Sequence, residues 1–369
     1  MNPFLLKGYH SPEYFCDRVE VTRKIINAIE NNQDITLYGF RRLGKSALIH
    51  HVFHHLQKDY LSIYADIWGT TSIEEFIKEL ANGIIKSNIF AKRKFSEKLA
   101  GFLKSIGASF TIGVDGMPAI EMIYNDRNQA FHNLDEIFGF LNQLKEPVIL
   151  AVDEFQEIKK YESNAPFEGK MRTITQQCNN VSFLFSGSEF HLLNEIFSTY
   201  SKPFYQSTRM LSIDKIDHQE YKEFIQHHFQ VAKKNLSETI IDHILEITHR
   251  HTYYTQAAMN LLFSQSKLPK TVAEFDLLFK EFVLEKSVFY GELPEQLTRQ
   301  QFAVVKGFAK SGLVQNPNSA DFMEKAKIRS ASSMHRIIHS LLEKQIIIKD
   351  DNAYRLYDVF LELFLRYTM

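Results

Sequence analysis

Eight residues near the amino terminus combine two glycines, a lysine and a serine at a spacing suited to holding phosphate groups. Residues 39–46 read GFRRLGKS and fit the pattern G-x-x-x-x-G-K-[ST]. The residues of this predicted loop are Gly39, Phe40, Arg41, Arg42, Leu43, Gly44, Lys45, Ser46 and the following Ala47. Its glycines let the backbone curl so that successive N–H groups point at phosphate oxygens. Lys45 is suited to bridging the β- and γ-phosphates of a nucleotide, and the Ser46 hydroxyl to coordinating Mg²⁺.

A pair of acids follows a second informative stretch. Residues 148–152 are five consecutive apolar residues, which favours a strand buried on both faces of a parallel sheet, and Asp153 and Glu154 come next. Open α/β sheets bind ligands beyond the carboxyl ends of such strands. We therefore predict that Asp153 holds Mg²⁺, directly or through water, and that Glu154 orients and deprotonates an attacking water. Paired acids favour hydrolysis over binding alone, so ATP, ADP and Mg²⁺ are the expected ligands.

Three further polar residues are candidates for contact with phosphate. Ser186 and Ser188 follow the predicted strand 181–185, where a hydroxyl can bond the γ-phosphate or the attacking water. The sequence does not choose between the two serines, and a simple turn is the alternative. Arg209 begins the predicted strand 209–213, and we predict that it reaches phosphate within the chain or across a subunit boundary. A structural salt bridge is the alternative for Arg209.

The segments around these residues alternate between strand and helix patterns. Strands are predicted at 34–38, 61–67, 148–152, 181–185 and 209–213, and helices at 19–31, 47–56, 73–89, 91–105, 134–144 and 171–178. Asp17 and Ser72 are expected to cap the helices that follow them. Residues 108–114 and 119–123 alternate in period two around Asp115-Gly116, which predicts a β-hairpin inserted into the core near 108–124. The polar residues 159–170 are predicted to form a loop.

The rest of the chain reads as two smaller domains. Four helical patterns between 218 and 285 suit a helical lid packed near the nucleotide. Three capped helices and a hairpin follow, with Thr298, Ser319 and Ser330 as the caps, and this order indicates a winged helix-turn-helix. We therefore predict an α/β P-loop core at 1–216 with an N-terminal arm, a lid at 217–290 and a winged helix at 291–369.

The winged helix can contact either DNA or protein. Its reading helix carries Ser332, Ser333, His335 and Arg336 near its start, which are residue types that contact bases and phosphates. It holds few cations, however, and Glu343, Asp350 and Asp351 lie nearby. Winged helices also serve as protein-contact modules, so both kinds of partner remain open for residues 319–357.

Composition limits the protein class. The chain of 369 residues is 44% hydrophobic and 24% charged, as expected for a globular protein with a sizeable core. Its net charge of −1 gives no overall basic field, so any nucleic-acid binding must depend on a local patch. Cys16 and Cys178 lie far apart and match no metal pattern, which favours a reduced setting. No signal peptide or transmembrane run is visible, so we expect a cytoplasmic protein without a membrane partner.

Taken together, these motifs resemble the archaeal-type ATPases of the STAND branch of AAA+ proteins (the MNS clade), in particular the paralogous set common in Bacteroidetes. The resemblance covers almost the whole chain. The segments that carry it are Asn2-Pro3-Phe4, Gly8-Tyr9, residues 12–18 with Glu20, residues 40–46, residues 153–157, residues 186–188 and the winged helix closing on residues 358–360. Many relatives have Gly where this chain has Asp17, and a Gly-x-Pro-Tyr-type lid turn where it has residues 250–253.

The resemblance implies a five-stranded parallel core, a helical lid, a C-terminal winged helix, and Arg18 near the adenine or ribose. Members of the family generally act as nucleotide-dependent switches in signalling, regulation or defence. We therefore expect a slowly hydrolysing Mg·ATP switch that binds another protein and can oligomerise with ATP. One alternative is an ATP-regulated DNA-binding protein that acts through its winged helix. The other is a scaffold that binds nucleotide permanently and hydrolyses nothing.

Overall fold

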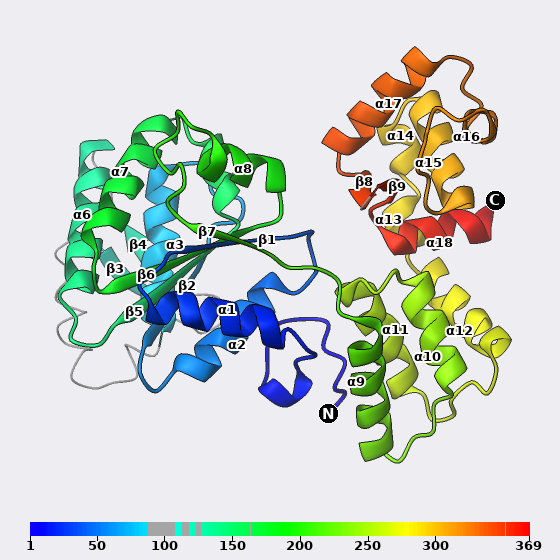
Figure 1. Ribbon diagram of the computed structural model, residues 1–369, viewed down its shortest axis with the longest axis horizontal. Coiled ribbons are helices and arrows are strands. Elements are labelled where there is room, and N and C mark those ends of the chain that lie inside the picture. Colours follow the sequence, from blue (N-terminus) through cyan, green and yellow to red (C-terminus); the bar gives the residue numbers. More distant parts are fainter. Residues whose placement is uncertain (88–107, 113–117, 123–126, 163, 351) are drawn as a thin grey trace. The chain divides into compact units, whose positions relative to one another are not determined.

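The chain folds into two compact units in the computed structural model (Figure 1). The structure describes residues 1–87, 108–112, 118–122, 127–162, 164–350 and 352–369. Residues 7–216 form one unit, which we call the core unit, and residues 1–6 with 217–369 form the other, which we call the lid unit. The predicted helix at 91–105 and the predicted turn at Asp115-Gly116 lie outside the described residues.

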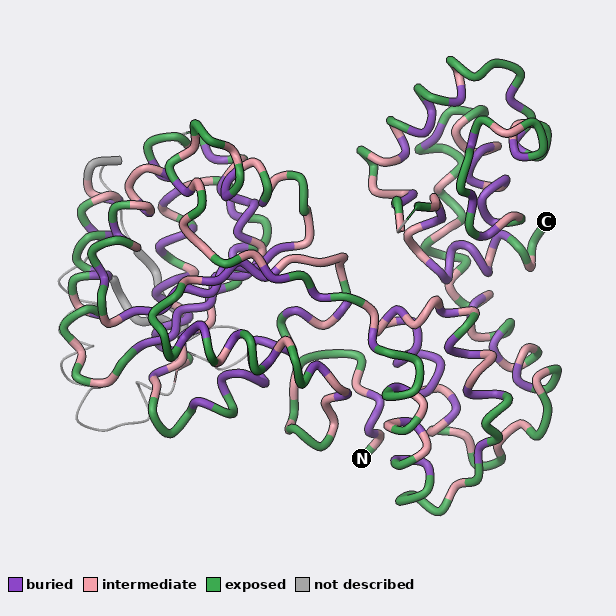
Figure 2. Tube along the Cα trace, in the orientation of Figure 1, coloured by how far each residue is buried: buried purple, intermediate pink, exposed green. Residues whose placement is uncertain are grey.

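A five-stranded parallel sheet organises the core unit, in the strand order β2-β5-β6-β1-β7. The strands are β1 (Ile35–Tyr38), β2 (Leu61–Asp66), β5 (Val148–Asp153), β6 (Val181–Gly187) and β7 (Arg209–Ser212). Every residue of β5 and β6 is buried, as Figure 2 shows for the centre of the sheet. The consecutive apolar residues 148–152 of β5 and 183–185 of β6 arise because helices cover both faces of a parallel sheet. The predicted α/β fold with a five-stranded parallel core is therefore confirmed.

Alternate residues of the central strands enter two separate hydrophobic cores. Leu150 and Val152 pack on one face of the sheet, whereas Ile149 and Ala151 pack on the other. The helices of the core unit are α1 (Val19–Glu30), α2 (Lys45–Leu56), α3 (Ile73–Lys86), α6 (Arg127–Asn142), α7 (Asn164–Gln177) and α8 (Phe190–Ser198), with short 3₁₀ turns at Pro12–Tyr14 and Phe155–Lys160. Helices α1 and α2 cover one face, and α3, α6, α7 and α8 contribute to the other (Figure 1). Helix α2, which follows the predicted phosphate loop, therefore packs directly against the sheet.

The predicted hairpin is present as the antiparallel strands β3 (Ala108–Ile112) and β4 (Pro118–Met122). The predicted loop at 159–170 was wrong, because most of it belongs to the 3₁₀ turn Phe155–Lys160 and the first turns of α7. Pro166 is tolerated in the first turn of α7, where backbone N–H groups have no partner within the helix. Phe167 then packs into the core at 0% exposure. Helix α8 was not predicted.

Four helices open the lid unit: α9 (His218–Val231), α10 (Glu238–Ile247), α11 (Thr252–Ser264) and α12 (Val272–Leu284). The first residues of the chain complete its core. Phe4 is fully buried, and its ring centroid lies 5.5 to 6.1 Å from those of Phe224, Phe229 and Phe263. Asn260 fixes this arrangement by donating to the Phe4 carbonyl at 2.7 Å. The chain therefore passes between the units twice, after Leu6 and after Ile216.

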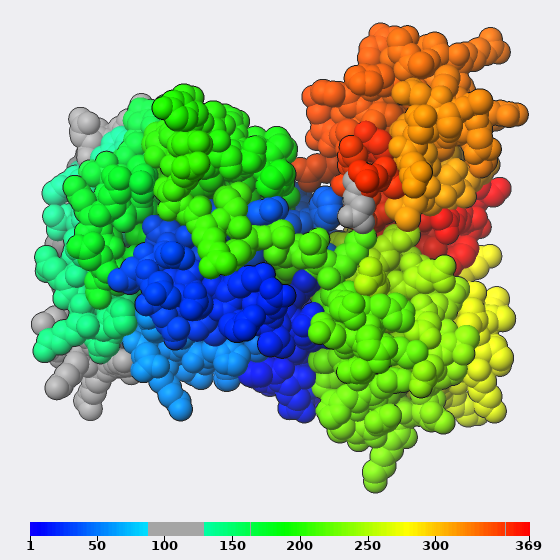
Figure 3. All heavy atoms as spheres, viewed as in Figure 1, coloured from blue at the N-terminus to red at the C-terminus, as the bar shows by residue number. Residues whose placement is uncertain are grey.

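A winged helix-turn-helix completes the lid unit. Its elements are α13 (Ser287–Tyr290), α14 (Leu293–Gln296), α15 (Arg299–Ser311), α16 (Ala320–Lys325), α17 (Ala331–Glu343), β8 (Ile347–Asp350), β9 (Ala353–Leu356) and α18 (Val359–Thr368). The side chains of Thr298, Ser319 and Ser330 accept backbone N–H bonds at the starts of α15, α16 and α17, which confirms these three predicted caps. The orange and red atoms of Figure 3 show this part as one closely packed body. Helix α18 packs against α12 and α15 and so joins the lid helices to the winged helix.

Among the described residues, no helix is long and apolar enough to cross a membrane.

Candidate active site

The parallel register brings the carboxyl ends of the central strands to one edge of the sheet. Asp66 at the end of β2 pairs with Asp153 at the end of β5, and Tyr38 at the end of β1 pairs with Gly187 at the end of β6. The segments that follow β1, β5 and β6 therefore meet at this edge. They carry the predicted phosphate loop, the two acids and the two serines, respectively.

Backbone geometry shapes the phosphate loop before α2. Gly44 has φ 97° and precedes the first residue of α2, Lys45, so the loop turns directly into the helix N-terminus. Gly39 is required for a different reason, namely close packing. A Cβ atom there would lie 2.4 Å from Cγ2 of Ile213 and 2.7 Å from its carbonyl oxygen. The loop thus rests on the backbone that leaves β7.

Lys45 extends back across the loop. Its Nζ donates to the carbonyl oxygens of Gly39 and Phe40 at 3.0 and 3.1 Å, and only 5% of the residue is exposed. Burial lowers the pKa of Lys45 below its ordinary value, because the charged form loses hydration. The nearby carboxylates of Glu154 and Asp153 oppose this lowering of the pKa. The lysine charge therefore faces the two acids.

Asp153 is the centre of a hydrogen-bond network that joins three hydroxyl groups and one backbone N–H. Its Oδ2 accepts from the Ser46 hydroxyl at 2.5 Å and from the Tyr64 hydroxyl at 2.6 Å. Its Oδ1 accepts from the Ser186 hydroxyl and from the Glu154 backbone N–H, the latter at 3.0 Å. Ser46 and Asp153 thus form an adjacent pair of hard oxygen donors. This donor set fits Mg²⁺, which is bound through one or two carboxylates together with substrate phosphates.

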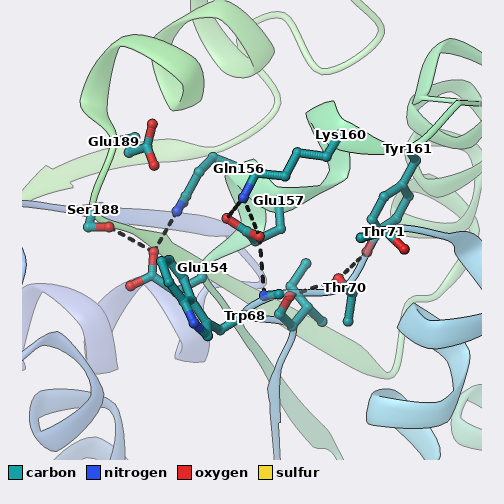
Figure 4. A network of polar contacts seen from close by, with 12 residues as sticks. Trp68, Thr70, Thr71, Glu154, Gln156, Glu157, Lys160, Tyr161, Ser188 and Glu189 are labelled. Carbon is teal, nitrogen blue, oxygen red and sulfur yellow. Dashed lines mark hydrogen bonds and ion pairs between the residues drawn. The ribbon is translucent and has the colours of Figure 1, made fainter. Parts of the chain in front are cut away.

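Glu154 occupies a left-handed backbone position, with φ 57° and ψ 42°. Its Oε2 accepts from Gln156 Nε2 at 2.5 Å and from the Ser188 hydroxyl at 2.8 Å (Figure 4). The sequence did not distinguish Ser186 from Ser188, and the structure gives each serine a different acid. Ser186 contacts Asp153, whereas Ser188 contacts Glu154.

Tyr64 and Gln156 were not predicted as site residues. Burial, followed by the charge of Asp153, raises the pKa of the Tyr64 hydroxyl, so this group remains a donor to Asp153 at neutral pH. Gln156 is 1% exposed and would clash with any side chain at position 187, because its Oε1 lies 2.0 Å from where a Cβ of Gly187 would stand. The sequence signal for each residue is its spacing from an acid. Tyr64 lies two positions before Asp66, and Gln156 lies two positions after Glu154.

Arg209 is not brought to this edge of the sheet. It pairs with Ile35 at the start of β1, whereas Ser212, at the other end of β7, pairs with Tyr38. Strands β1 and β7 are parallel, so Arg209 lies at the amino end of the sheet and the phosphate loop at the carboxyl end. The prediction that Arg209 reaches phosphate within its own chain is corrected by this register. Contact across a subunit boundary stays a prediction.

Arg18 lies against the phosphate loop. It donates to the carbonyl oxygen of Leu43 at 3.2 Å and to the carbonyl oxygen of Asp214, and it is buried. Arg18, rather than the predicted Asp17, is the residue that precedes α1. Both have left-handed backbones, with φ 53° for Asp17 and 71° for Arg18, a conformation that glycine adopts with least strain.

Comparison with family models gives two matches. The family described as "ATPase domain predominantly from Archaea" matches residues 15–258, which is more than half of the chain. A model described as "probable winged helix domain" matches residues 288–367. None of the curated proteins matches the sequence.

Solved structures with the same fold include three archaeal proteins. The Walker-type ATPase PABY2304 of Pyrococcus abyssi is 19% identical with a TM-score of 0.69, and the match covers 99% of both chains. The ORC2 protein of Aeropyrum pernix, in ADPNP–ADP complexes, is 12% identical with a TM-score of 0.59 over 100% of this chain and 98% of that one. The ORC1 protein of Aeropyrum pernix, in complex with DNA, is 11% identical with a TM-score of 0.53 over 99% and 96%. These likenesses show a shared fold, and the family match over residues 15–258 shows that the chain belongs to the family of ATPase domains found predominantly in Archaea.

Proposed function

We propose that this protein is an Mg·ATP-binding switch of the STAND type with slow hydrolysis, and that its role is regulatory or signalling. The observation that carries the proposal is the convergence of three separate segments at one edge of the sheet. Lys45 and Ser46 come from the phosphate loop. Asp153 ends β5 and Glu154 follows it, and Ser188 follows β6. The resemblance of the sequence motifs to a set of STAND proteins common in Bacteroidetes supports the regulatory role.

Each side chain has a distinct part in this proposal. Lys45 neutralises phosphate charge, and the loop N–H groups hold phosphate oxygens at the start of α2. Ser46 and Asp153 would hold Mg²⁺, which supplies charge neutralisation on the phosphates. Glu154 accepts the proton of the attacking water. Hydrolysis is slow because one Glu154 oxygen already accepts bonds from Gln156 and Ser188, which weakens it as a base.

A route for switching begins at the phosphate loop. Ile213 packs against Gly39, and the carbonyl oxygen of Asp214 accepts from Arg18. These residues lie directly before Ile216 and Asp217, where the chain leaves the core unit for the lid unit. A phosphate loop that differs between ATP and ADP would therefore bias the conformation of this connection. A switch needs such a difference, because a ligand shifts an equilibrium only by its unequal affinity for the two states.

We expect hydrogen exchange at residues 213–217 to differ between the ATP-bound and ADP-bound protein. The measurement is mass-spectrometric exchange with saturating ATPγS, with ADP and without nucleotide, together with light scattering to follow oligomer mass. Lys45→Ala is the control, since a variant that does not bind nucleotide should exchange identically in all three conditions. Equal exchange and equal mass for both nucleotides, despite measured binding of each, would exclude the switch and leave the nucleotide-bound scaffold.

A specific observation favours a second candidate, ATP-regulated DNA binding. Ser332, His335 and Arg336 are exposed on α17, the reading helix of the winged helix, while Met334 and Ile337 face the core. If this face binds DNA, Arg336→Ala is expected to weaken duplex binding by about tenfold and to lower its salt dependence. Electrophoretic shifts at several salt concentrations provide the measurement. Lys267→Ala removes an exposed cation between α11 and α12, outside the winged helix, and as the control it should leave duplex binding unchanged.

A further inference from the structure

Arg41 is a residue of the phosphate loop whose side chain the loop pattern does not require. The pattern uses the backbone at this position, so any side chain would satisfy it. The Arg41 guanidinium nevertheless lies against Ser188, Glu189 and Trp68. Its Nε donates to the Ser188 hydroxyl at 3.3 Å, its Nη2 lies 3.4 Å from Glu189 Oε1, and its carbon lies 4.6 Å from the ring centre of Trp68.

The contacts of Arg41 with Glu189 and Trp68 are individually weak. Charge-assisted bonds between arginine and a carboxylate are typically about 2.7 to 2.9 Å long, and the Glu189 contact is longer than that. A cation stacked on an exposed aromatic ring is held less strongly than one on a buried ring, and Trp68 is 54% exposed. The Arg41 side chain itself is 35% exposed. A ligand that offered two strong acceptors would therefore compete well with the Glu189 and Trp68 contacts.

The position of Arg41 connects it to the reacting groups. The Ser188 hydroxyl that accepts from Arg41 donates its proton to Glu154, so a single serine separates the guanidinium from the proposed general base. The charge of Arg41 is also felt at Lys45. Burial is the main cause of the lowered pKa of Lys45, and the positive charge of Arg41 adds to that lowering. Arg41 and Lys45 are thus two cations on one short loop, near the acids Asp153 and Glu154. Two neighbouring cations favour the binding of a polyanion.

We propose that Arg41 is a catalytic residue that binds the γ-phosphate of ATP, and that Trp68, Ser188 and Glu189 hold its side chain when the nucleotide is ADP. This inference rests on the proposed ATPase function and adds a residue to it. Arginine is suited to the task because its planar fork can donate two bonds to one phosphate. An arginine that reaches the transferring phosphoryl group stabilises charge in the transition state. Here the same chain supplies it, and only side-chain torsions need to change.

Trp68 reports on this movement directly. It is the single tryptophan of the chain, so intrinsic fluorescence comes from this residue when tryptophan is selectively excited. Loss of the stacked guanidinium should shift its emission. We expect ATPγS to change the Trp68 emission of the wild-type protein, ADP to leave it near the nucleotide-free value, and Arg41→Ala to abolish the difference between the two nucleotides.

Hydrolysis gives an independent readout of the same substitution. Arg41→Ala should lower kcat by about 100-fold or more while the Kd for ADP changes little, because ADP has no γ-phosphate to lose. Arg41→Lys should recover part of kcat, since it restores the charge but not the planar fork. Lys160→Ala is the matched control. Lys160 is a second cation near Trp68, with Nζ 5.7 Å from the ring centre, and it pairs with Glu157 (Figure 4).

The outcomes separate this inference from the function on which it rests. If calorimetry shows that the wild-type protein binds neither ADP nor ATPγS, the proposed function itself is wrong. If the wild-type protein binds and hydrolyses ATP, an unchanged kcat in both Arg41 variants overturns the catalytic role of Arg41. A Trp68 emission that responds equally to ADP and ATPγS, or that still responds in Arg41→Ala, overturns the exchange of partners. Circular dichroism and ADP binding of Arg41→Lys show whether a loss of activity reflects folding.

Discussion

Replacing Glu154 with Gln is expected to remove nearly all ATP hydrolysis and to leave ATP bound. A general base contributes about 10² to 10⁴ in rate, and an amide at this position cannot accept the proton of the attacking water. The fold should tolerate the change, because the amide oxygen of Gln still accepts from Ser188 and from Gln156, the two donors that contact Glu154 now. Phosphate release and calorimetric ATP binding measure the two effects separately.

The control for this substitution is Glu162→Gln. Glu162 is an exposed acid that follows the 3₁₀ turn Phe155–Lys160. Its replacement should leave the hydrolysis rate at the parental value. Hydrolysis by Glu154→Gln at the parental rate would remove Glu154 from the mechanism. If the parental protein itself retains nucleotide through purification and releases no phosphate, the scaffold replaces the switch.

Lys45→Ala should abolish measurable nucleotide binding. A hydrogen bond to a charged group contributes about 1.5 to 3 kcal/mol, and several phosphate oxygens would lose their cation at once, so the Kd is expected to rise by at least about 100-fold. The carbonyl oxygens of Gly39 and Phe40 would also lose the donor that Lys45 supplies, which loosens the loop itself. Calorimetric titration with ATP and ADP gives the Kd, and thermal melting shows that the variant remains folded.

Lys58→Ala is the matched control for Lys45→Ala. Lys58 is exposed and lies just beyond the end of α2. The substitution therefore removes the same charge, but at the far end of the helix that begins at Lys45. Its nucleotide affinity should equal that of the parental protein. Normal ATP binding by Lys45→Ala would show that the phosphate loop does not hold the triphosphate, and the proposed function would then lose its basis.

Both substitutions test residues that were identified from the sequence. They could be identified because their patterns depend only on residues that are close in the chain. The phosphate loop is eight consecutive residues whose pattern reflects backbone curvature and a helix start, and both are determined by neighbours in the chain. Strand β5 could also be predicted from the sequence, because a strand buried on both faces is a nearly continuous run of apolar residues. The caps Thr298, Ser319 and Ser330 lie within three residues of the N–H groups they bond.

Contacts between distant segments were beyond the reach of these local patterns. Residues 159–170 look polar, yet Phe167 and Glu168 are buried because α7 packs against the sheet. Arg209 was placed near phosphate because it begins a strand, but which end of a strand meets the site depends on strand direction and register. The helix α8 that follows β6 was missed for a similar reason, since its apolar face is defined only by the core that it covers.

The sequence by itself determined that a phosphate loop, an acidic strand end and a winged helix occur in this chain, because each is encoded in a short contiguous pattern. Only the tertiary structure decided which side chains meet. Ser186 and Ser188 are two residues apart, so on an extended strand end they point in the same general direction. Ser186 nevertheless contacts Asp153, and Ser188 contacts Glu154. This difference follows from how β5 and β6 pair and then turn. Tyr64 reaches Asp153 across 89 positions of sequence for the same reason. Hydrogen bonds over such separations depend on the packing of the whole sheet, and no local pattern of residues records that packing.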